Sequence, residues 1–167
     1  MIIMPKTRFQ GIIFGLLMSI TMAYGMEVYN VALKEGGFAR MTNQVFLGAL
    51  LEAAYMWIFV FLFSNLWGNR LGHRLASKIC LPQDNPFLHT LFISGCTVLV
   101  MCPTMSMVAA ILFSVILGGG SWSQLPAYWV ATVLKNFPMA LLWNLFAAGP
   151  VSRLLFRRIF ARQLASS

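Results

Sequence analysis

The chain has 167 residues, of which 59% are hydrophobic and only 10% are charged, and its mean hydropathy is +0.78. Soluble domains carry about 25% charged residues, so this composition excludes a protein whose whole surface faces water. The formal net charge is +8, and the positions of the basic residues decide what that charge means.

Four long apolar segments account for the hydrophobic excess. They are expected to be helices at about residues 9–33, 45–67, 90–117 and 128–148. Each reaches the roughly 20 residues that a helix needs to cross the hydrocarbon of a bilayer. The segments show no alternation of apolar and polar residues, so helices rather than barrel strands are expected to satisfy the backbone in lipid. The sequence therefore predicts an all-α integral membrane protein with four transmembrane helices.

The basic residues gather at three places outside these segments. They precede the first helix, lie between the second and third, and follow the fourth: Lys6 and Arg8; Arg70, Arg74 and Lys78; Arg153, Arg157, Arg158 and Arg162. The other two connections hold only Lys34 and Arg40. The positive-inside rule then predicts a bacterial inner-membrane protein with both termini and the middle loop in the cytoplasm. The clusters after the second and fourth helices are expected to contact anionic lipid headgroups rather than nucleic acid.

The chain aligns with itself at an offset of 83 residues. The matching positions include the turn glycines and the basic exits: Gly36-Gly37 with Gly119-Gly120, and Arg70, Leu71 and Arg74 with Arg153, Leu154 and Arg157. Each copy has two helices, a glycine-rich outer turn and a basic exit, and both copies have the same orientation. Parallel repeats are related by an axis along the membrane normal. We therefore expect a four-helix bundle with pseudo-twofold symmetry, built from residues 1–81 and 82–167.

Two stretches carry a family resemblance. "RFQGIIFGLLMSITMAYGMEVYN" and "NFPMALLWNLFAAGPVSRLLFRR" resemble the start and end of a small bacterial membrane module catalogued as domain of unknown function 2798, which often occurs as one helix pair. The resemblance covers nearly the whole chain as two copies. The first copy departs from the pattern, with Tyr55 where the second has Pro138 and Trp67 where the second has Pro150. The family has no established activity, so the resemblance implies the fold and no catalytic residue.

Three charged side chains lie within the predicted membrane segments, namely Glu27, Glu52 and Lys135. Lys135 is at the position equivalent to Glu52 in the second copy. At 1.5 Å per residue, all three fall roughly 10 Å below the outer boundary. A charge within a span costs several kcal/mol unless it is paired, hydrated or near an interface. We therefore expect an ion pair between Glu52 and Lys135 across the pseudo-twofold axis, with Glu27 as a second acid nearby and Tyr55 and Asn136 as hydrogen-bond donors.

Two prolines are expected to kink helices near this level. Pro138 withdraws a hydrogen bond from the carbonyl of Leu134, and Pro103 does the same to Leu99. Freed carbonyls occur where transport proteins bind ions, and also in helices with no such role. Three interpretations of the charges stay open: a structural pair that fixes how the copies dock, a proton- or cation-coupled site in which Glu27 carries the proton, and a snorkelling lysine with unpaired, protonated glutamates.

Other chemistries have little support in the sequence. The cysteines Cys80, Cys96 and Cys102 form no CxxC pair and are expected to pack as small apolar residues. There is no nucleophile–base set, P-loop or dinucleotide fingerprint, so we predict no enzyme, no cofactor and no metal. Gly11 and Gly15 form a GxxxG motif, which suits packing within the bundle as well as a homodimer. An unidentified membrane partner stays open too.

The sequence thus favours a polytopic bacterial inner-membrane protein with a structural or accessory role. The alternative is a small proton- or cation-coupled transporter or efflux protein that uses Glu27 and Glu52. The basic, amphipathic tail at residues 151–167 is expected to be an interfacial helix that continues the fourth helix, or a tail that docks a protein.

Overall fold

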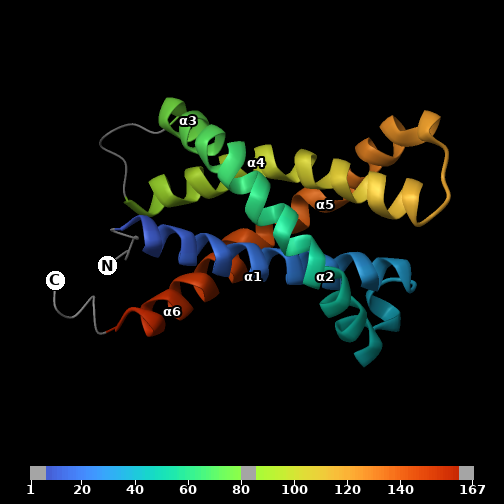
Figure 1. The fold of residues 1–167 in the computed structure, drawn as a ribbon, viewed down its shortest axis with the longest axis horizontal. Helices are drawn as coiled ribbons and strands as arrows, with labels where there is room; N and C mark the ends of the chain where they lie inside the picture. The colour runs from blue at the N-terminus through green and yellow to red at the C-terminus, as the bar shows by residue number, and fades with distance from the viewer. Residues whose placement is uncertain (1–6, 80–85, 162–167) are drawn as a thin grey trace. The chain divides into compact units, whose positions relative to one another are not determined.

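The computed structural model describes residues 7–79 and 86–161, and every regular element in these ranges is helical (Figure 1). The α-helices are α1 (Arg8–Lys34), α2 (Asn43–Phe63), α3 (Asn69–Ile79), α4 (Pro86–Ala109), α5 (Leu125–Trp143) and α6 (Gly149–Ile159). Three π-helical segments follow α2, α4 and α5 directly: Ser64–Gly68, Ala110–Ile116 and Asn144–Ala148. Short 3₁₀ turns at Phe38–Arg40 and Trp122–Gln124 precede α2 and α5. The all-α prediction is confirmed for the described residues.

Four helical segments of the described chain are long and apolar enough to cross a membrane, as the sequence predicted. They are Arg8–Lys34, Asn43–Ile79, Leu91–Ile116 and Trp122–Ile159. The second is longer than the predicted range, because an apolar run marks where lipid would end and not where the helix ends. The fourth continues through α6 to Ile159, as expected for a tail helix that continues the fourth helix. A helix of 37 residues is about 55 Å long, whereas the hydrocarbon is about 30 Å thick. The polar, basic α3 and α6 are therefore continuations of membrane-length helices.

The described helices form two compact units. The first contains Met1–Phe61 with Trp143–Ser167, and the second contains Leu62–Leu142. Both boundaries fall inside the long helices. We call α3 and α6, the basic helices that end the first and the second copy, the exit helices. Each unit therefore joins the helix pair of one copy to the exit helix of the other copy. In the first unit α6 packs on α1, and in the second α3 packs on α4. Since α1 corresponds to α4 and α3 to α6 under the 83-residue offset, the two units are equivalent in composition.

Aromatic rings join α1 to α6 in the first unit. Phe14 meets Phe156 edge to face with ring centroids 5.7 Å apart, and Phe9 meets Phe160 in the same way at 6.4 Å. Such pairs contribute about 0.5–1.5 kcal/mol each beyond the area they bury. The order of the contacts makes the two helices antiparallel. The start of α1 and the end of α6 therefore lie at the same end of this unit (Figure 1).

Small residues let α3 approach α4 closely in the second unit. Gly72 and Ala76 on α3, and Gly68 at the end of the π-helical segment before it, are buried at four-residue spacing on one helix face. A Cβ atom at Gly72 would lie 2.8 Å from the Cα of Thr97, which is closer than real side chains approach. Small residues at this spacing let the two helix backbones approach closely. By contrast, a Cβ at Gly11 of the predicted GxxxG motif would meet no described atom within 4 Å.

In each unit, a tryptophan near the start of the exit helix donates a hydrogen bond to a threonine on the first helix of the other copy. In the first unit, Trp143 Nε1 donates to the carbonyl of Thr21 at 3.0 Å. In the second unit, Trp67 Nε1 donates to the hydroxyl of Thr104 at 3.4 Å. Thr21 and Thr104 are equivalent positions, and each threonine hydroxyl bonds the carbonyl four residues before it. Gly25 leaves the space that the Trp143 ring occupies.

The backbone contact at Gly72 predicts a large effect for a small substitution. We expect Gly72→Ala to lower the stability by about 1–3 kcal/mol, because the new methyl group would overlap the α4 backbone at Thr97. Gly95→Ala is the matched control on α4, since its Cβ would meet nothing within 4 Å. Thermal unfolding in detergent micelles measures both. Equal melting temperatures for the two variants would contradict the packing of α3 on α4.

Candidate functional site

A tight hairpin between α1 and α2 builds the site in the first unit. Gly36 and Gly37 have φ angles of +106° and +87°, which favour glycine. The Gly37 N–H donates to the carbonyl of Ala32 at 2.8 Å, and the Gly36 N–H to that of Leu33 at 3.4 Å, as in a Schellman cap. The glycine-rich turn predicted for this copy is therefore present, while its position on the outer side stays a prediction. It reverses the chain within a few residues and brings the start of α2 back along the end of α1.

An apolar core holds the two helices of the hairpin together. Val31, Ala32, Val45 and Ala49 are buried in one cluster, with Tyr24 and Val28 packed against it. Positions three, four and seven residues apart share a helix face. Glu27 and Lys34 therefore share the face of Val31, and Glu52 shares the face of Val45 and Ala49. The hairpin brings these charged side chains together.

Lys34 and Glu52 form an ion pair between the two helices. The Nζ atom of Lys34 lies 3.0 Å from both Glu52 carboxylate oxygens. The side chain of Lys34 is 46% exposed and that of Glu52 is 22% exposed. A pair this accessible contributes about 1 kcal/mol or less, but it takes up both oxygens of Glu52. Sequence reasoning missed Lys34 as a site residue, because it treated that lysine as a loop charge.

Glu27 lies deeper in the same hairpin. Its side chain is only 3% exposed, and its Oε2 atom has no hydrogen-bond partner among the described residues. The carboxyl group is within hydrogen-bonding reach of Glu52 and of the Asn30 side chain, and it interacts electrostatically with Lys34. Tyr55, one turn after Glu52, interacts electrostatically with both acids. We call Glu27, Lys34, Glu52 and Tyr55 the acid cluster.

The remaining predicted site residues belong to the second unit. Lys135 is exposed on α5, and Asn136 is buried with an Oδ1 atom that has no hydrogen-bond partner within the described chain. The pair between Glu52 and Lys135 thus joins residues of different units and stays a prediction. Pro103 and Pro138 lie inside α4 and α5, and the kinks expected from them stay predictions too. The Pro103 carbonyl accepts a hydrogen bond from Trp129 Nε1 at 2.9 Å.

The basic exits place their charges on exposed helix faces. On α3, Arg70, Arg74 and Lys78 are exposed, opposite the buried Gly72 and Ala76.

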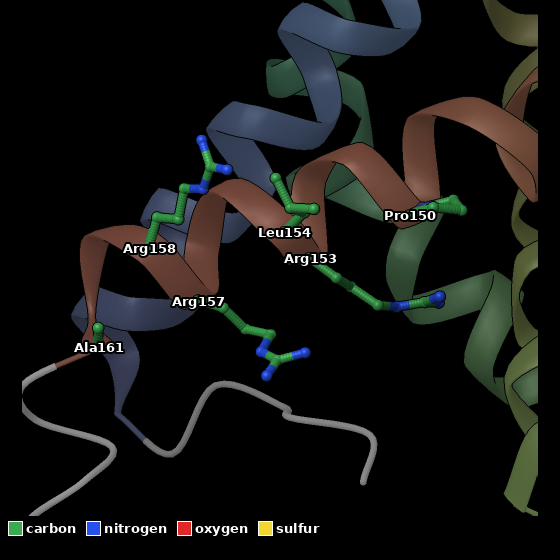
Figure 2. Close-up of a pocket in the computed structure, with 6 residues that line it drawn as sticks. All are labelled: Pro150, Arg153, Leu154, Arg157, Arg158 and Ala161. Carbon is green, nitrogen blue, oxygen red and sulfur yellow. The ribbon is translucent and has the colours of Figure 1, made fainter.

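On α6, Figure 2 shows a hollow lined by Pro150, Arg153, Leu154, Arg157, Arg158 and Ala161. Arg153 and Arg157 extend to the same side of the helix, one turn apart (Figure 2). Arg162, the last of the predicted headgroup contacts, lies outside the described residues.

The cysteines and other metal-ligating residues form no cluster in the described chain. Cys96 and Cys102 are buried in α4, while Cys80 is outside the described ranges. The Cys102 sulfur lies 3.9 Å from the Ser106 hydroxyl. Among the described residues, no three histidine, cysteine, aspartate or glutamate side chains lie close enough together to hold a metal ion. The acid cluster is therefore the candidate site that the geometry supports.

The ion pair of the hairpin is measurable by a double-mutant cycle. We expect Lys34→Met and Glu52→Gln to show a coupling energy of about 0.5–1 kcal/mol in unfolding experiments, because each variant removes the same contact. Arg40→Met with Glu52→Gln is the matched control and is expected to be additive. Additive behaviour of Lys34 and Glu52 would contradict the pair. The same cycle with Lys135→Met tests the pairing that the repeat predicts.

Comparison with known proteins supports both the family resemblance and the repeat. The model of the family described as domain of unknown function (DUF2798) matches the chain twice, at residues 7–80 and 83–160. The uncharacterized protein YybC of Bacillus subtilis (strain 168) is 26% identical over 168 residues, which cover 98% of this chain and 99% of that protein. No solved structure matches the chain. The chain belongs to the DUF2798 family and contains two tandem copies of its domain.

Proposed function

We propose that the chain is a polytopic protein of the bacterial cytoplasmic membrane with a structural or accessory, non-enzymatic role. The observation that carries this proposal is the set of four helices long and apolar enough to span a bilayer, two of which continue into basic exit helices. The full-length similarity to a Bacillus protein supports the bacterial setting. The ion pair and the indole contacts serve helix packing in this proposal.

Both termini and the middle connection lie in the cytoplasm under this proposal. The positive-inside rule supports this orientation, since the basic residues concentrate on α3, on α6 and before α1. The contact of Phe9 with Phe160 is consistent with it, because it places the two ends of the described chain at one end of the first unit. The acid cluster then lies toward the outer side, near the Gly36-Gly37 turn.

The exit helices are proposed to bind anionic lipid headgroups. Each Lys or Arg near an anionic leaflet contributes about 1 kcal/mol to attraction. The α6 side chains Arg153 and Arg157 lie one turn apart on the same side (Figure 2), where both can face the headgroup layer. The apolar face of α6 is occupied by α1, through Phe156 and Phe160. The helix therefore contacts lipid through its basic face and protein through its apolar face.

A small proton- or cation-coupled transporter or efflux protein is the second candidate function. The observation that favours it is the Oε2 atom of Glu27, which is buried without a hydrogen-bond partner among the described residues. Ionisable residues inside membrane segments often mark ion pathways. Under this candidate, Glu27 and Glu52 bind the coupling ion.

The orientation is testable by thiol labelling. In a variant with Cys80, Cys96 and Cys102 replaced by serine, we introduce one cysteine at the exposed Ser121 or at the exposed Ser77. An impermeant maleimide added to intact cells is expected to label Ser121→Cys at once, but Ser77→Cys only after permeabilisation. The opposite pattern would overturn the proposed topology.

A flux measurement separates the two candidate functions. The protein is reconstituted in liposomes that hold a pH-sensitive dye, and a pH gradient is imposed. Under the structural proposal, proton flux is expected to equal that of the Glu27→Gln variant. A faster flux that Glu27→Gln abolishes, while Glu35→Gln leaves it intact, would replace the structural proposal with the transporter.

A further inference from the structure

We propose that Glu27 binds one proton, which it shares with Glu52, and that Lys34 is the counter-cation that covers this proton site. The inference concerns binding alone, and it holds whether or not the chain transports the proton. It starts from two carboxyl groups within hydrogen-bonding reach of each other. Two carboxylates that close cannot both stay ionised at low cost, so one of them carries a proton.

The hydrogen bonding of the cluster indicates which acid holds the proton. Both Glu52 oxygens accept from the Lys34 ammonium at 3.0 Å, so both already have a hydrogen-bond donor. Glu27 is 3% exposed and has an oxygen without a partner among the described residues. A proton on that oxygen turns it from an acceptor into a donor. The new O–H group can donate to the Glu52 carboxylate, which removes the unpaired polar atom.

The charge of the cluster leads to the same assignment. With both glutamates ionised and Lys34 protonated, the cluster has a net charge of −1 in a mostly apolar hairpin. One bound proton brings that charge to zero. The polar and charged groups that face Glu27 within the first unit are Asn30 and Lys34 on α1, and Glu52 and Tyr55 on α2.

A proton suits this site better than a metal cation. Calcium and magnesium ions take about six or more oxygen ligands. Both oxygens of Glu52 are already engaged by Lys34, which leaves the Glu27 carboxyl group and the Asn30 side chain that interacts with it as oxygen ligands. A proton requires only one donor and one acceptor, and the Glu27–Glu52 contact supplies both.

Lys34 lies between the proton site and the exposed end of the hairpin. It is the last residue of α1, its side chain is 46% exposed, and its four-carbon stem is flexible. When the proton leaves, the O–H bond of Glu27 breaks and its electron pair stays on the carboxylate. The proton passes to water or to Glu52. Lys34 then neutralises one of two carboxylates, and rotation of its stem lets it contact either.

Infrared spectroscopy of the full-length protein in lipid nanodiscs tests the proposal. The C=O stretch of a protonated carboxyl group is resolved from the carboxylate band. We expect this C=O band in the parent at neutral pH and its loss as the pH is raised. The band is expected to be absent in Glu27→Gln and retained in Glu35→Gln, whose parent residue is an exposed acid in the same hairpin. A parent without the band, or a Glu27→Gln variant that keeps it, would overturn the proposal.

Chemical labelling of the unmodified chain supplies a second measurement that needs no variant to fold. Dicyclohexylcarbodiimide is lipophilic and reacts with protonated carboxyl groups. Mass spectrometry is expected to find one adduct per chain, on the peptide that contains Glu27, and a yield that falls as the pH rises. An adduct on Glu52 or Glu35 in place of Glu27 would overturn the assignment.

Two comparisons test the role of Lys34 and the identity of the ligand. Lys34→Met is expected to keep the C=O band to higher pH than the parent, because the ammonium that stabilises the ionised acids is gone, while Arg40→Met titrates like the parent. A Lys34→Met titration identical to the parent would exclude Lys34 as the counter-cation. Replacing choline chloride by sodium chloride at constant pH is expected to leave the band unchanged. Its loss in sodium would show that a metal cation binds in place of the proton.

Discussion

The hydrocarbon of a bilayer offers no water to donate or accept hydrogen bonds, and four helices of the described chain are long and apolar enough to span it. The backbone of the described membrane-length segments is helical, and their Thr21 and Thr104 hydroxyls bond carbonyls of their own helix. The Trp143 indole finds its partner in a neighbouring helix. Glu27 has a buried oxygen without a hydrogen-bond partner among the described residues, as do Asn136, Asn144 and Ser152. The candidate site is therefore one of the places in the described chain where a buried polar atom has no hydrogen-bond partner.

The second organising feature is the exchange of exit helices between the copies. The helix pair of one copy and the exit helix of the other together make one compact unit. The contact of α6 with α1 in the first unit and that of α3 with α4 in the second are equivalent. Aromatic rings make the first contact, and glycines allow the close approach in the second. Duplication thus preserved the arrangement of the helices while the residues at their interfaces diverged. The same divergence placed Glu52 and Lys135 at equivalent positions of the two copies.

Much of the fold was predictable from the sequence, because apolar run length and turn glycines are local signals. The four membrane-length helices, the tandem copies and the turn at Gly36 and Gly37 follow from such signals. The continuation of the second helix to Ile79 does not, since helix formation outside lipid leaves no apolar run. The sequence also does not show which helices pack together, because periodicity shows which face of a helix is apolar and not which helix covers it. Lys34 was missed because its pairing with Glu52 depends on where α1 ends, and the predicted helix ended one residue too early.

Because the exit helices are exchanged, each compact unit needs helices from both copies of the domain. A helix pair that lacks the other copy's exit helix cannot complete either compact unit. A protein with one copy of this domain would have to obtain that helix from a second molecule. Formation of its compact unit would then depend on the protein concentration. Here the connection between the copies makes the encounter intramolecular, at an effective concentration that is in the millimolar range for short linkers. The two copies in this chain therefore correspond to the two subunits of a dimer joined into one polypeptide, and their sequences have diverged.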